Sequence, residues 1–137
     1  MKNIDEIKER AGKLAEQYGL DLLVLFGSQV TGFTHKESDV DVAYLSDRKL
    51  SFEDEILLNT DLTEIFGNDK VSLVNLRQAP PLLAKRIVSE GIVLYAKTSS
   101  LFSQLYAQTL RTYEEALPLF ELRRRYLDYK LKQYQRA

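Results

Sequence analysis

The chain lacks cysteine altogether and has a single histidine, His35. These absences exclude disulfides, a thiolate nucleophile and a Cys-ligated zinc site, and they argue against a His-ligated metal centre. No sign of charge dominates, because 19 Lys and Arg face 20 Asp and Glu for a net charge of −1. Bulk charge therefore does not bind this chain to nucleic acid or to an anionic membrane.

Long hydrophobic stretches are also missing. The longest apolar run is LLVLF, whereas a membrane-spanning helix needs roughly 20 apolar residues. The polar N-terminal stretch MKNIDEIKER has no apolar core of the kind found in secretory signals. With 137 residues, the chain is predicted to be one soluble, cytoplasmic domain with a sizeable core.

Charge and aromatic residues are distributed unevenly along the chain. Residues 1–97 hold 12 Lys/Arg and 16 Asp/Glu, a net charge of −4, whereas residues 98–137 hold 7 and 4, a net charge of +3. The second segment also contains seven of the fourteen aromatic side chains. We therefore divide the chain into a body, residues 1–97, and a C-terminal helical extension, residues 98–137.

Apolar spacing and turn residues predict the element order α-β-β-α-β-α-β-α. The expected helices are 3–18, 52–66 after an N-cap at Ser51, 80–90, and 99–135 with a kink or break at Pro118. The expected strands are 21–26, 39–45, 71–76 and 92–95, with 29–38 as a loop or short helical turn. This order predicts an α/β or α+β fold in which helices pack on a mixed four-stranded sheet.

Two aspartates separated by one residue, Asp39 and Asp41, fall on the second expected strand. Alternate residues of a strand point to the same face, so the two carboxylates are expected to lie side by side. Paired carboxylates of this kind suit a hard divalent cation such as Mg²⁺. By itself an Asp-x-Asp pair is more often an exposed strand without a role.

A second motif accompanies the aspartates. The first expected strand ends in Gly27-Ser28, and ten residues separate Ser28 from Asp39. Glycine lets a backbone approach a phosphate closely, and serine offers a hydroxyl and an amide to its oxygens. Gly-Ser alone is usually a simple turn, and only the combination with the aspartate pair indicates a nucleotide site.

The run Leu25-Phe26-Gly27-Ser28, followed after ten residues by Asp39-Val40-Asp41, resembles the G-S-x10-D-x-D signature of the DNA-polymerase-β-like nucleotidyltransferases. Residues 1–97 resemble the minimal nucleotidyltransferase (MNT) domain, with 71–82 similar to its third core strand and Pro-bearing helix and 91–95 to its last strand. The extension is similar to that of MNT antitoxins, which pair with HEPN-domain toxins.

This resemblance implies a reaction and a role for each motif residue. Gly27 and Ser28 would hold the β- and γ-phosphates of ATP, and Asp39 and Asp41 would bind Mg²⁺. The chain would transfer AMP from ATP to a tyrosine hydroxyl of a HEPN ribonuclease toxin, releasing pyrophosphate and neutralising the toxin. Assembly into a homo-oligomer or a hetero-oligomer with the toxin is compatible with this reading.

The sequence departs from the family at its third carboxylate. Ser72 and Asn75 stand where relatives place aspartates on the next strand, and Asp69 is a candidate substitute. Serine is a poor Mg²⁺ ligand, so the site is either served by another acid, slowed, or able to bind ATP without turnover. A tyrosine acceptor, with a pKa of about 10, would lessen the need for a base.

Two alternatives to a protein adenylyltransferase stay open. The chain is a weakened antitoxin that neutralises its partner by binding alone, which Ser72 favours, or a nucleotidyltransferase for small molecules, which the lack of a second domain disfavours. The extension has more apolar faces than one sheet can cover, and Arg and Tyr are enriched at interface hot spots. We expect it to bind the partner rather than RNA, with a solvated basic helix as the plain alternative.

Overall fold

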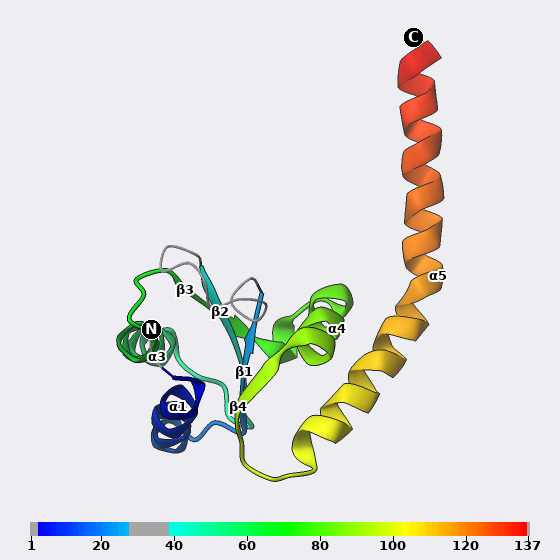
Figure 1. The fold of residues 1–137 in the computed structure, drawn as a ribbon. Helices are drawn as coiled ribbons and strands as arrows, with labels where there is room; N and C mark the ends of the chain where they lie inside the picture. Colours follow the sequence, from blue (N-terminus) through cyan, green and yellow to red (C-terminus); the bar gives the residue numbers. More distant parts are fainter. Residues whose placement is uncertain (1–2, 28–38, 137) are drawn as a thin grey trace.

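The structure, a computed structural model, describes residues 3–27 and 39–136 (Figure 1). The elements follow the predicted order, with one short 3-10 turn added. They are α1 (Ile4–Tyr18), β1 (Leu22–Phe26), β2 (Val40–Leu45), α3 (Phe52–Phe66), β3 (Val71–Asn75), η1 (Leu76–Gln78), α4 (Pro81–Glu90), β4 (Ile92–Ala96) and α5 (Leu101–Arg136). The prediction for residues 29–38 lies outside the described residues.

Local capping sets the helix boundaries. The Ser51 hydroxyl accepts a hydrogen bond of 3.1 Å from the Asp54 backbone N–H, which confirms the predicted start of α3. Helices α1 and α3 both end at glycines in the left-handed region, Gly19 with φ 68° and Gly67 with φ 62°. Glycine adopts this conformation without the penalty that a Cβ imposes, so both helices stop where the sequence indicated.

The third strand is shorter than predicted. It ends at Asn75, because the Asn75 side chain accepts a 3.0 Å hydrogen bond from the Arg77 backbone N–H and turns the chain into η1. Leu76, expected as the last strand residue, is buried as the first residue of this turn.

The four strands form one mixed sheet in the order β3-β2-β1-β4. Strand β1 runs antiparallel to β2 and to β4, whereas β2 and β3 are parallel. The prediction of a mixed four-stranded sheet with packed helices is confirmed.

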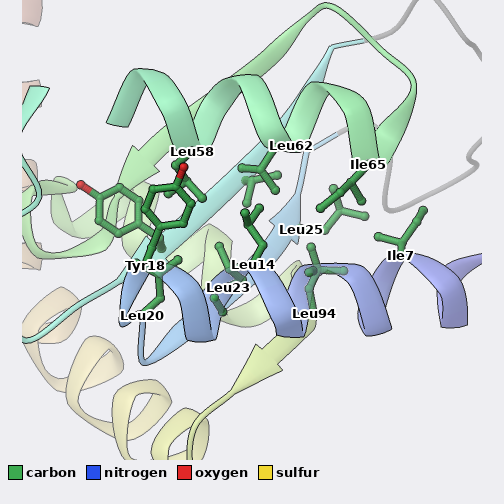
Figure 2. Packing of buried hydrophobic residues seen from close by; sticks show 14 of the residues in the cluster. Ile7, Leu14, Tyr18, Leu20, Leu23, Leu25, Leu58, Leu62, Ile65 and Leu94 are labelled. Atoms are coloured by element: carbon green, nitrogen blue, oxygen red, sulfur yellow. The ribbon is translucent and has the colours of Figure 1, made fainter. Parts of the chain in front are cut away.

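One face of the sheet is covered by α1 and α3. Figure 2 shows the side chains of the two helices pointing toward one another above the strands. The Tyr18 hydroxyl donates a 2.9 Å hydrogen bond to Asp61 of α3, and burial, followed by this hydrogen bond, raises the pKa of Tyr18 to about 12. The larger part of the core lies here, formed by Ile7, Ala11, Leu14, Ala15, Tyr18, Leu20, Leu23, Leu25, Val40, Val42, Tyr44, Leu50, Leu58, Leu62, Ile65 and Leu94.

The opposite face is covered by α4 and the first part of α5 (Figure 1). A second buried cluster lies between these helices and the sheet, formed by Leu22, Val24, Phe26, Ala43, Leu76 and Ile87. Leu101, Phe102 and Leu105 of α5 pack against this cluster and are partly buried.

Helix α5 is continuous from residue 101 to 136 and contains Pro118. The helix bends near its middle and its second half projects away from the body (Figure 1). Proline removes one backbone donor and crowds the preceding turn, so a kink rather than a break is the outcome here. In the part of the chain that the structure describes, no helix is long and apolar enough to cross a membrane.

Candidate active site

The two predicted aspartates lie at the start of β2, beside the end of β1. Asp41 pairs with Phe26 across the antiparallel β1–β2 ladder, and Asp39 immediately precedes the strand and is exposed. Asp41 lies on the sheet face of Ala43, the face covered by α4 and α5. The structure therefore brings Asp39 and Asp41 together at one end of this face, as the motif predicted.

Gly27 ends β1 with a backbone φ of 80°, in the left-handed region. A Cβ built on Gly27 would lie 3.2 Å from Cγ and 3.4 Å from Cβ of Asp41, and closer still to Oδ2. Glycine is thus required here for two reasons, since a side chain would strain the backbone and would also displace the Asp41 carboxylate. The motif predicted a role for Gly27 toward phosphate, but no sequence pattern indicated its contact with Asp41.

The environment of Asp41 disfavours its negative charge. Burial raises the pKa of Asp41 above its ordinary value of 3.8, and the neighbouring Asp39 carboxylate raises it further. A bound divalent cation would reverse both effects, because it supplies the positive charge that this pair lacks. The donor set, two carboxylates with only oxygen atoms, fits Mg²⁺.

Ser72 lies next to Asp41 on the neighbouring strand. The parallel β2–β3 register pairs Asp41 with Ser72 and Ala43 with Val74, which places the Ser72 side chain on the face of the aspartates. Ser72 is exposed, so its hydroxyl is accessible at the site. The position that a third carboxylate would occupy on this strand is therefore taken by a neutral hydroxyl.

The two other residues considered for that role are placed elsewhere. Asn75 pairs with Tyr44, on the opposite face of the sheet, and its side chain caps η1. Asp69 is exposed in the turn before β3. Among residues 3–27 and 39–136, no three His, Cys, Asp or Glu side chains form a group that could hold a metal ion. Asp69 therefore does not complete a three-acid group with the aspartate pair.

Part of the predicted site is not covered by the structure. Ser28, the second residue of the Gly-Ser motif, and His35 lie outside the described residues. The assignment of Ser28 to phosphate binding stays a prediction from the motif.

Comparison with known proteins gives the family. Residues 9–100 match the polymerase beta nucleotidyltransferase family. A protein adenylyltransferase MntA from Shewanella oneidensis is 32% identical over 99 residues, which cover 65% of this chain and 70% of the relative.

Solved structures have the same fold. A chain of a toxin–antitoxin complex with AMP-PNP superposes with a TM-score of 0.74 and 27% identity, over 90% of this chain and 98% of that one. A chain of a complex between a tri-AMPylated Shewanella oneidensis HEPN toxin and its MNT antitoxin gives a TM-score of 0.71 at 24% identity, over 94% and 99%. Both cover α5 as well as the body, so the resemblance extends beyond residues 1–97. With its paired aspartates beside a glycine-ended strand and its match over most of the body, this chain belongs to the polymerase beta nucleotidyltransferase family.

Proposed function

We propose that this chain is an antitoxin that transfers AMP from ATP to a tyrosine hydroxyl of a HEPN-domain toxin and thereby neutralises it. The observation that carries the proposal is the pairing of Asp39 and Asp41 at one end of the sheet, against Gly27. The names of the relatives, protein adenylyltransferase and toxin–antitoxin complex with an ATP analogue, support the same reaction. We expect the reaction to take place in the cytoplasm, where ATP is available.

The transfer is a single in-line displacement. The phenolic oxygen of the acceptor attacks the α-phosphorus of ATP, the bond from that phosphorus to the oxygen bridging the β-phosphate breaks, and pyrophosphate leaves. The phenolic proton passes to solvent. Asp39 and Asp41 would hold Mg²⁺, and Gly27 and Ser28 would face the phosphates. Mg²⁺, when bound, supplies positive charge that offsets the triphosphate and the leaving pyrophosphate.

Ser72 makes a phenol the fitting acceptor. Its neutral hydroxyl next to Asp41 is a weak base, and it offers no negative charge to bind a second metal ion. A tyrosine with a pKa of about 10 loses its proton far more easily than an aliphatic alcohol. The site therefore favours an acceptor that needs little base catalysis.

The C-terminal extension, residues 98–137, supplies the partner surface in this proposal. Every residue from 122 to 136 is exposed, among them Leu122, Tyr126 and Leu131 at 63%, 57% and 60%. Large exposed apolar side chains mark interaction surfaces. Residues 122–137 also carry six basic and one acidic side chain, a net charge of +5, which suits an acidic surface on the toxin.

The test is AMP transfer from labelled ATP to the purified HEPN partner. Asp39→Asn with Asp41→Asn should abolish labelling while the protein stays folded. The matched control is Asp69→Asn, which also removes a nearby carboxylate but lies outside the aspartate pair. Undiminished labelling by the double variant would end the proposal, and Asp69→Asn should label the toxin like the wild-type chain.

A second function, neutralisation by binding alone, is favoured by the neutral Ser72 at the third-acid position. The two functions differ in stoichiometry. A transferase inactivates many toxin molecules per antitoxin and needs ATP, whereas a blocking protein acts one to one without ATP. Titration of the toxin's ribonuclease activity with wild-type chain, with and without ATP, separates them.

A further inference from the structure

A cavity of about 430 Å³ lies between the end of β2, η1, α4 and the first half of α5. It begins at Leu45, four residues along β2 from Asp41, which is about 13 Å at roughly 3.3 Å per residue. Its volume falls within the range of small-molecule sites. Its apolar wall is formed by Leu45, Leu76, Ala79, Pro81, Ala84, Leu101 and Leu105. Neither Gly27 nor the two aspartates line the cavity, which has the size of a ligand site.

The other wall is polar and comes from one side of α5. It is formed by Gln104, Gln108, Thr109 and Thr112, of which Thr112 donates its hydroxyl to the Gln108 carbonyl in a 3.1 Å hydrogen bond. Thr109 is only 8% exposed, and within the described part of the chain its hydroxyl makes no hydrogen bond. In the described residues, every fully enclosed side-chain oxygen or nitrogen has a hydrogen-bond partner. The Thr109 hydroxyl has no partner among these residues and is therefore not fully enclosed, so we place its open side toward the cavity that Thr109 lines.

A single cation completes the lining. The Arg77 Nε donates a 2.8 Å hydrogen bond to the Ser46 carbonyl, and its Nη2 lies 3.4 Å from Asp47 Oδ1. A guanidinium has five donors, so this anchored Arg77 keeps donors for a further acceptor. Among the described residues that line the cavity, none is acidic. The lining therefore offers an anionic group the remaining donors of Arg77, whose charge is partly offset by the exposed Asp47 carboxylate.

We propose that this cavity binds a nucleoside monophosphate at a site distinct from the transfer site. The apolar wall suits the flat face of a base, and two Gln amides suit its hydrogen-bonding edge, as amide side chains do with adenine. The Thr109 hydroxyl meets the ligand deeper in the cavity, and Arg77 meets the phosphate. A fatty acid fits less well, because it would leave the buried Thr109 hydroxyl without a partner.

The test uses AMP as the probe and keeps the transfer site silent. AMP is titrated calorimetrically into the full-length Asp39→Asn/Asp41→Asn chain in the presence of EDTA, with inorganic phosphate and adenosine as separate titrants. We expect saturable one-to-one binding of AMP that is tighter than that of either part. Gln108→Leu and the nearly isosteric Thr109→Val should each weaken it about 3- to 10-fold, the loss of one hydrogen bond.

Gln133→Leu is the matched control, because it makes the same change on the exposed part of α5 away from the cavity. It should bind AMP like the parent, and thermal melting should show all variants folded. Absence of saturable AMP binding, equal affinity for inorganic phosphate, or unchanged affinity in Gln108→Leu would overturn the proposal. Since the parent variant lacks the aspartate pair, the outcome is independent of whether the chain transfers AMP.

Discussion

Replacing Gly27 with alanine should separate backbone strain from damage to the aspartate pair. Gly27 has a φ of 80°, and a left-handed conformation costs a residue with a Cβ about 1–2 kcal/mol. The new methyl would also lie 3.2 Å from Cγ of Asp41 and closer to its Oδ2, so the carboxylate must move away.

Gly67→Ala is the matched control for this variant. Gly67 has a φ of 62°, and a Cβ there would meet nothing within 4 Å. Both variants should therefore lose about 1–2 kcal/mol of unfolding free energy, roughly 3 to 8 °C in melting temperature for a chain of this size. Only Gly27→Ala should also displace a residue of the site.

The decisive measurement is AMP transfer at a temperature where both variants are folded, together with the Mg²⁺ concentration for half-maximal rate. A displacement of about 1 Å in a catalytic group can lower the rate on the order of 100-fold. We expect such a loss, with a raised Mg²⁺ requirement, in Gly27→Ala and near wild-type transfer in Gly67→Ala. Wild-type transfer in both variants would refute the assignment of Gly27 as the residue that seats Asp41.

The site and the extension lead to four further predictions. Asp41→Asn should raise the unfolding free energy near neutral pH. The pKa of Asp41 is higher in the folded protein than in the unfolded chain, so the wild-type protein loses stability as the pH rises from 3.8 through the raised pKa. Chemical denaturation should therefore give the wild type and the variant the same unfolding free energy at pH values below 3.8. The same ionisation should strengthen Mg²⁺ binding as pH rises through the raised pKa, and a Mg²⁺ affinity that stays constant from pH 4 to 7 would contradict a role for Asp41 as ligand. Ser72→Asp should increase the transfer rate and extend it to serine hydroxyls on an otherwise identical toxin, measured by mass spectrometry; an unchanged acceptor preference would show that Ser72 does not set it. Residues 122–137 carry a net charge of +5, and those that the structure describes are exposed. Deleting them should weaken toxin binding and reduce its dependence on salt, while the melting temperature and ATP binding stay unchanged. A truncated chain that binds the toxin with wild-type affinity would contradict the proposed role of the extension.

The elements of the fold were predictable because their signals are local. Ser51 caps α3 through a hydrogen bond to a residue three positions away, and Gly19 and Gly67 end helices through their own φ angles. The end of β3 was predicted one residue too late, because the Asn75 side chain accepts a hydrogen bond from the Arg77 backbone N–H and turns the chain out of the sheet. The spacing of apolar residues does not indicate such a side-chain hydrogen bond to the backbone.

The motif residues and the family were also contained in the sequence. Asp39 and Asp41 share a strand face by the two-residue period alone, and the spacing from Gly27 to the pair was enough to indicate the nucleotidyltransferase family, which the comparisons confirm. The roles of Gly27, Ser28 and the aspartates toward ATP and Mg²⁺ stay predictions.

Only the tertiary structure decided which distant residues meet. The parallel register that sets Ser72 beside Asp41, and turns Asn75 to the other face, depends on how β3 pairs with β2, which the sequence of neither strand specifies. The contact of Gly27 with the Asp41 carboxylate depends on the β1–β2 ladder in the same way. The cavity lined by Thr109 is formed by residues of β2, η1, α4 and α5, which are far apart in the chain. Contacts between segments far apart in the chain are set by packing, and a one-dimensional pattern of residue types records only which face each side chain takes.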